Sequence, residues 1–162
     1  MEQGVDTVFA DSLIVPQCVY RPGSFTGLMT IYESNYLKFR QLAGDLRFLD
    51  TPWISTVPDD CDLHLECTRR DPYTTTLQMT YWFEEGDGEW IADPDLTVRL
   101  YHDARLAEAR GECTSHRHAV LRALANGHSV ELDRRWHSNI MLNKWLDYLL
   151  ETGHRFRQEP AS

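Results

Sequence analysis

The sequence lacks the long apolar run that a membrane-spanning helix requires. None of its purely apolar stretches approaches the roughly 20 residues that cross a bilayer. Its first residues, MEQGVDTVFADS, also lack the basic start and apolar centre of a secretory signal peptide. We therefore expect a cytosolic protein without a membrane partner.

Positive charge is scarce as well. The chain carries 16 Lys and Arg residues against 25 Asp and Glu residues, a formal net charge of −9 at pH 7. Proteins that bind nucleic acid normally present a basic surface that displaces counterions from phosphate groups. This acidic balance makes nucleic acid an unlikely partner, but it does not exclude a local basic patch.

The common motifs of catalysis and cofactor binding are missing. The sequence has no GxSxG nucleophile elbow and no GxGxxG or GxxxxGK[ST] phosphate loop. Within the acidic loop 84–95, residues 84–89 lack the ligand spacing of a calcium loop, and a solvated turn explains them. We assign no catalytic residue and expect no cofactor.

Metal-binding and disulfide patterns are weak. The cysteines form no CxxC pair, so we expect reduced thiols at Cys18, Cys61, Cys67 and Cys113. A His-x-His pair can ligate zinc if further ligands converge, but the sequence shows no second half of such a site. We expect no metal site and interpret these residues as ordinary histidines: His116, His118 and His128.

Composition indicates a folded core. The chain is 42% hydrophobic and contains five Trp, seven Tyr and six Phe residues, which argues against disorder. Its 162 residues fit one domain. Because prolines and glycines interrupt the start, we divide the chain into a partly extended arm (1–29), a single α+β domain (30–155) and a tail (156–162).

Two segments have helical periodicity. Thr30 and Glu33 have the spacing of a capping box, apolar residues follow at helical intervals, and Gly44 supplies a stop. We expect a short helix over 30–43. Near the other end, Asp133 can cap a helix that ends before Gly153, with a wide apolar stripe. The stripe comprises Trp136, Ile140, Leu142, Trp145, Leu146, Leu149 and Leu150.

The middle of the chain alternates as β-strands do. Alternation over 62–67 and 74–83 around a polar turn predicts an antiparallel hairpin. It restarts over 96–101, and a further strand or bulged continuation is expected over 104–109. The predicted fold class is α+β: an antiparallel sheet of about four or five strands, with an N-terminal helix and a C-terminal amphipathic helix packed on one face.

The segment 96–104, LTVRLYHDA, is the most distinctive part of the chain. With Glu33-Ser34-Asn35-Tyr36, Tyr73-Thr74-Thr75 and Asn139 through Trp145-Leu146, it resembles the bacterial YqiB-like family, a domain of unknown function. The stretches before and at the start of the last helix depart from that family's pattern. The resemblance implies a small soluble cytosolic bacterial protein and carries over no reaction.

The residues around this segment are the candidate site. Arg99 offers a planar fork for carboxylate or phosphate, and Tyr101 offers an aromatic plate beside it. The proposed ligand- or partner-binding set is Arg99, Tyr101, His102, Asp103, Arg105 and Tyr73. An alternative is that Arg99 forms an internal pair, for instance with Glu33 or Glu66, that holds a helix to the sheet. The His102-Asp103 dipeptide lacks the further helical ligands of an HD-type phosphohydrolase, so we interpret it as a turn.

The leading hypothesis is a non-enzymatic cytosolic binding or regulatory protein that engages a protein partner through this polar surface. The alternative is a small enzyme or sensor that acts on a nucleotide or other anionic metabolite through Arg99, His102 and Asp103. A third possibility is a structural subunit that exposes Trp53 or Trp90 to a partner. The sequence leaves the oligomeric state open.

Overall fold

The structure, a computed structural model, describes residues 24–48, 52–110 and 134–156. Five of the residues discussed above lie outside this part of the chain: Cys18, Cys113, His116, His118 and His128. The expected cap at Asp133 lies outside it too.

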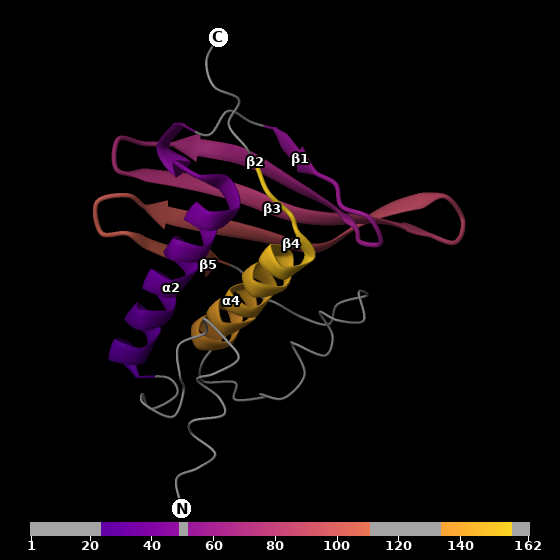
Figure 1. Ribbon diagram of the computed structural model, residues 1–162. Coiled ribbons are helices and arrows are strands. Elements are labelled where there is room, and N and C mark those ends of the chain that lie inside the picture. Colours follow the sequence, from indigo (N-terminus) through magenta and orange to yellow (C-terminus); the bar gives the residue numbers. More distant parts are fainter. Residues whose placement is uncertain (1–23, 49–51, 111–133, 157–162) are drawn as a thin grey trace, which may run out of the picture.

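The centre of the fold is an antiparallel sheet of five strands in the order of the sequence. The strands are β1 (Trp53–Ser55), β2 (Asp62–Arg70), β3 (Thr74–Glu85), β4 (Glu89–Tyr101) and β5 (Leu106–Arg110). Each strand pairs with its neighbour through antiparallel ladders, which gives a simple meander (Figure 1). The predicted sheet is confirmed, including the last strand near residues 104–109.

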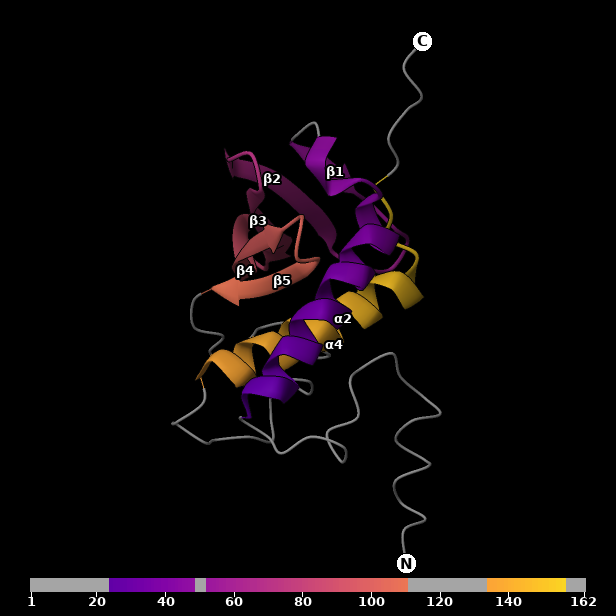
Figure 2. The same cartoon turned by 90° about the vertical axis from the view of Figure 1, so that its left-hand side faces the viewer.

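Two helices cover one face of this sheet. They are α2 (Phe25–Ala43) and α4 (Arg134–Thr152), with a short 3-10 turn η1 (Leu46–Phe48) after α2. Figures 1 and 2 show both helices in one layer on the same side of the strands. The α+β class is confirmed.

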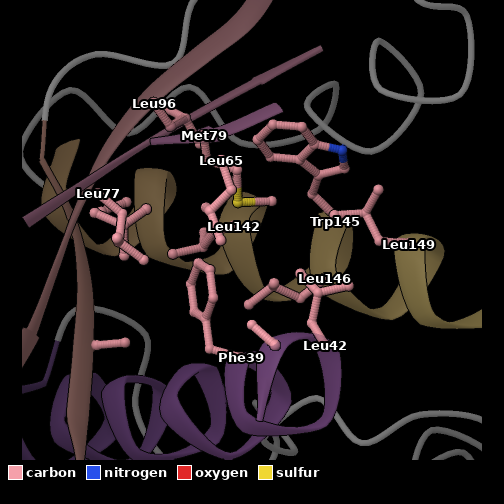
Figure 3. Close-up of a cluster of buried hydrophobic side chains, with 14 of the residues drawn as sticks. Phe39, Leu42, Leu65, Leu77, Met79, Leu96, Leu142, Trp145, Leu146 and Leu149 are labelled. Atoms are coloured by element: carbon pink, nitrogen blue, oxygen red, sulfur yellow. The ribbon is translucent and has the colours of Figure 1, made fainter. Parts of the chain in front are cut away.

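Strand alternation supplies the sheet's half of the core. Every second side chain of a strand points to the same face of the sheet. On the face toward the helices the buried residues are Leu63, Leu65, Leu77, Met79, Tyr81, Leu96, Val98 and Leu100. The helices complete the core with Phe39 and Leu42 of α2 and with the stripe of α4, in which Leu142, Trp145, Leu146 and Leu149 are fully buried (Figure 3). The middle of the predicted stripe therefore packs against the sheet, whereas Trp136 and Ile140 form a separate cluster with Ile31 of α2.

The start of the first helix differs from the prediction. The helix begins at Phe25, and the Ser24 side chain accepts a hydrogen bond from the Gly27 amide at 3.1 Å. Thr30 lies inside the helix, where its hydroxyl donates to the Thr26 carbonyl at 2.9 Å. The prediction that Thr30 caps the helix is wrong, because the Ser24 side chain caps a first turn that begins earlier in the chain. The predicted stop is present, since Gly44 has a φ of 71°.

The acidic stretch 84–95 is not a loop throughout, which corrects a second expectation. Strand β3 continues to Glu85 and β4 starts at Glu89, so only Gly86–Gly88 turn, with Gly88 at a φ of 80°. Pro94 has no backbone N–H to donate to a neighbouring strand. It is tolerated because it lies at a bulge, opposite the register shift between Thr80 and Trp82, where no such hydrogen bond is required. The result is a two-stranded ribbon that projects beyond the other strands (Figure 1).

Candidate functional site

Arg99 and Tyr101 lie on the sheet face opposite the two helices. They alternate with the buried Val98 and Leu100. The guanidinium carbon of Arg99 lies 5.6 Å from the centre of the Tyr101 ring, within the range of a cation–π contact. The Nε atom of Arg99 is buried and has no hydrogen-bond partner. Within the described residues no ion pair joins Arg99 to Glu33 or Glu66, the pairing offered as the internal alternative.

Tyr101 is fixed by the neighbouring strand. Its hydroxyl donates to Glu108 Oε1 at 2.7 Å, and Glu108 lies directly across from Arg99 in the β4–β5 ladder. Burial raises the pKa of Tyr101, and the hydrogen bond and charge of Glu108 act in the same direction. The Tyr101 ring is therefore held as a neutral plate beneath the guanidinium.

The rest of this outer face is polar and internally bonded. Gln78 and Thr80 both donate to Asp95 Oδ1, at 2.6 and 2.7 Å. Thr97 donates to Gln78 Oε1 at 2.9 Å. Among the described residues, Arg99 Nε is the one buried guanidinium or ammonium nitrogen without a hydrogen-bond partner.

The other candidate residues do not converge on Arg99. The ring of His102 turns toward the helix side, where Nε2 lies 2.7 Å from the hydroxyl of the fully buried Thr75. Burial lowers the pKa of His102, and the charge of Arg47 adds to this. Asp103 and Arg105 lie in the exposed β4–β5 turn, with Arg105 at a φ of 55°, and Tyr73 is 68% exposed at the β2–β3 turn.

A second group of polar residues links the end of the chain to the sheet. His154 Nδ1 lies 3.0 Å from Ser55 Oγ, and its Nε2 lies 3.0 Å from Asp60 Oδ2. Because a carboxylate only accepts, Nε2 donates to Asp60; in the neutral ring, Nδ1 then accepts from the Ser55 hydroxyl. Sequence reasoning missed this arrangement, since these residues are far apart in the chain and no motif marks them.

A Ser-His-Asp chain invites comparison with an acyl-transfer triad, but its surroundings suit a structural clasp better. His154 is 0% exposed and Ser55 is 6% exposed, so a substrate has little access to either. The Arg155 amide donates to Ser55 Oγ at 3.2 Å, and Tyr81 and Tyr148 both donate to Asp60. The cluster ties residues after α4 to β1 and to the loop before β2.

Comparison with known proteins adds one finding. Residues 38–155 match the model of the DUF1249 family, described as a protein of unknown function. The chain belongs to the DUF1249 family. No curated protein and no solved structure matches it. The match does not carry the YqiB-like name, so that finer label remains a resemblance.

The DUF1249 region includes a buried ion pair between the helices. Lys38 Nζ of α2 lies 2.7 Å from Asp147 Oδ1 of α4 and donates to Asn143 Oδ1 at 2.8 Å. Burial lowers the pKa of Lys38, against the opposing hydrogen bond and charge of Asp147. Asn143 also donates to Asn35 Oδ1 at 3.0 Å and to the Ser34 hydroxyl at 2.9 Å. These bonds fix how the two helices meet.

The same network reaches the edge of the sheet. Asn139 of α4 accepts from the Ala109 amide at 2.7 Å and donates to the Ala109 carbonyl at 3.4 Å. Asn35 of α2 donates to the Ala107 carbonyl at 3.4 Å. Two side-chain amides thus satisfy the outward backbone groups of β5, the last strand of this DUF1249 sheet.

Several remaining expectations concern single residues of this DUF1249 protein. Cys61 and Cys67 are free thiols, as expected, and no group of three metal ligands occurs among the described residues. Trp53 stacks on Phe156 with ring centroids 5.6 Å apart, whereas Trp90 is 60% exposed. Neither described helix has the length and apolar character needed to span a membrane.

Proposed function

We propose that this DUF1249 protein is a cytosolic binding or regulatory protein that engages an acidic protein partner through the outer face of its sheet. One observation carries the proposal: half-buried Arg99 alternates with the core residues of β4 and so lies on the outer face of the sheet, and no described residue accepts a hydrogen bond from its Nε. Neither terminal nitrogen of Arg99 is among the buried atoms without a partner, so the guanidinium can still present them to a partner's carboxylate.

The surroundings of Arg99 support an acidic partner. The Tyr101 ring holds the guanidinium in place, so less side-chain entropy is lost on binding. Exposed Arg110 lies on the same face of β5, two residues after Glu108, and adds a second positive charge. Exposed Tyr73 at the end of the neighbouring hairpin offers an aromatic anchor of the kind enriched in interfaces.

The alternative is a small enzyme or sensor for a nucleotide or other anionic metabolite. It requires Arg99, His102 and Asp103 to act on one ligand. The hydrogen bond between His102 and Thr75 holds the imidazole on the helix side of the sheet instead, which favours the partner hypothesis.

A charge-reversal pair tests the proposal. Arg99→Glu changes the outer face, and Arg40→Glu makes the same charge change on an exposed position of α2. Proteins captured by the wild type should be identified, purified and titrated against both variants. We expect Arg99→Glu to weaken a genuine partner by roughly thirtyfold, the loss typical of a central interface Arg, and Arg40→Glu to leave the affinity unchanged.

Equal affinity for Arg99→Glu and the wild type would refute the interface. A thermal-shift series with nucleotides tests the alternative in parallel, because a ligand that binds the folded state raises the melting temperature as its concentration grows. If a nucleotide stabilises the wild type and Arg99→Glu abolishes this stabilisation, the ligand of this face is a metabolite and the protein-partner hypothesis is wrong.

A further inference from the structure

An open cleft lies at the opposite end of the sheet from Arg99. Its volume is about 400 Å³, and its lining comprises Asp59, Asp60, Cys61, Asp62, Trp82, Phe83, Glu84 and Trp90. One wall is the loop that precedes β2, and the other is the projecting β3–β4 ribbon. The volume falls within the range of small-molecule sites, which is roughly 300 to 1,000 Å³.

Aromatic rings form the apolar part of the cleft. Trp82 lies edge-on to His64, with ring centroids 6.1 Å apart, so its position is supported. Trp90 is 60% exposed at the start of β4, directly across the ladder from Glu84. Trp82 and Trp90 therefore both line the cleft, and most of the Trp90 indole is open to solvent there.

The polar part of the cleft is negative. Its described lining contains four carboxylates and neither Lys nor Arg. Burial raises the pKa of the Cys61 thiol, and the charges of Asp60 and Asp62 raise it further. Asp60 is engaged by Tyr81, Tyr148 and His154, which leaves Asp59, Asp62 and Glu84 to face a ligand.

This combination suits an organic cation. Indole faces attract ammonium groups through the ring quadrupole, and carboxylates at the rim complete the charge. A bare metal ion would gain little from the aromatic walls, and the described residues contain no convergent set of three metal ligands. We propose that the cleft binds a small free organic cation that carries one or more ammonium groups.

Titration with spermidine tests the assignment. Calorimetry at constant ionic strength should show saturable binding to the wild type. Trp90→Ala and Glu84→Gln should each weaken it by about fivefold, the effect of one cation–π or partly screened charge contact. Matched substitutions of an exposed aromatic and an exposed carboxylate outside the cleft, Phe25→Ala and Glu66→Gln, should leave it unchanged.

Three results would overturn the proposal. The first is the absence of saturable heat with spermidine. The second is equal binding of Mg²⁺ and spermidine with no effect of Trp90→Ala, which would indicate a counterion cloud over the acidic residues. The third is tighter binding of a capped lysine peptide than of spermidine, which would assign the cleft to a protein side chain.

Discussion

Replacing Asp147 by Asn should destabilise the protein strongly, because it removes the charge that faces a buried ammonium group. The Lys38 side chain is 2% exposed and that of Asp147 is 16% exposed, so water replaces little of the lost interaction. Breaking a buried pair by removing one partner costs about 3–5 kcal/mol. Asn143 still accepts from Lys38, so we expect the lower end, about 3 kcal/mol, or roughly 10 °C in melting temperature.

The loss should depend on pH with a definite sign. Burial already holds the pKa of Lys38 below its usual 10.5, and Asp147 opposes this shift, so Asp147→Asn lowers the pKa further. Between the folded-state pKa and 10.5 the unfolded chain binds more protons, and stability rises with pH. The variant enters this window at a lower pH than the wild type. The difference in the free energy of unfolding between the wild type and Asp147→Asn should therefore become smaller as pH rises from neutral toward alkaline values.

Urea unfolding followed by tryptophan fluorescence at pH 6, 7.5 and 9 measures both effects. Asp45→Asn is the control: it removes a charge from the exposed pair with Arg47 and should change stability little. A loss below about 1 kcal/mol for Asp147→Asn would show that the ion pair is not buried as described. A loss of stability that stays constant up to pH 9 would show that Lys38 keeps its proton in both folded proteins over this range.

Two further substitutions probe the packing of the ends of the fold. Asp60→Asn replaces a carboxylate that accepts from Tyr81, Tyr148 and His154. We expect the free energy of unfolding in urea to fall by about 3 kcal/mol. An unchanged free energy of unfolding would argue against the clasp. Gly27→Ala places a Cβ 2.9 Å from the Trp136 ring, so the helices must shift, at a cost of about 1–3 kcal/mol. A thermal scan that finds Gly27→Ala as stable as the wild type would contradict this close approach.

The sheet and the last helix were predictable because their signals are local. Alternation along β2, β3 and β4 and the wide apolar stripe of α4 each reflect which residues must face a core. The start of α2 was not predictable, since Ser24 and Thr30 both have capping chemistry and only the structure shows that the Ser24 side chain accepts from the Gly27 amide. The ribbon around Gly86–Gly88 has the sequence pattern of a loop because its side chains face water on both sides.

The candidate site was predictable only in part. Alternation placed Arg99 and Tyr101 on the outer face, and the structure keeps them together. The same alternation places His102 on the helix side of the sheet, although it is adjacent to Tyr101 in the sequence. Ser55, Asp60 and His154 meet through long-range packing, and no sequence spacing encodes such a meeting.

The pairing of Asn139 and Asn35 with the backbone of β5 bears on the solubility of the protein. The outer strand of a sheet is a template on which another chain can add a strand, and natural proteins must block it. Here two carboxamides occupy the positions that an incoming strand would need at Ala107 and Ala109. Loss of either amide would favour β-strand addition at this edge and would also weaken the buried network between the helices.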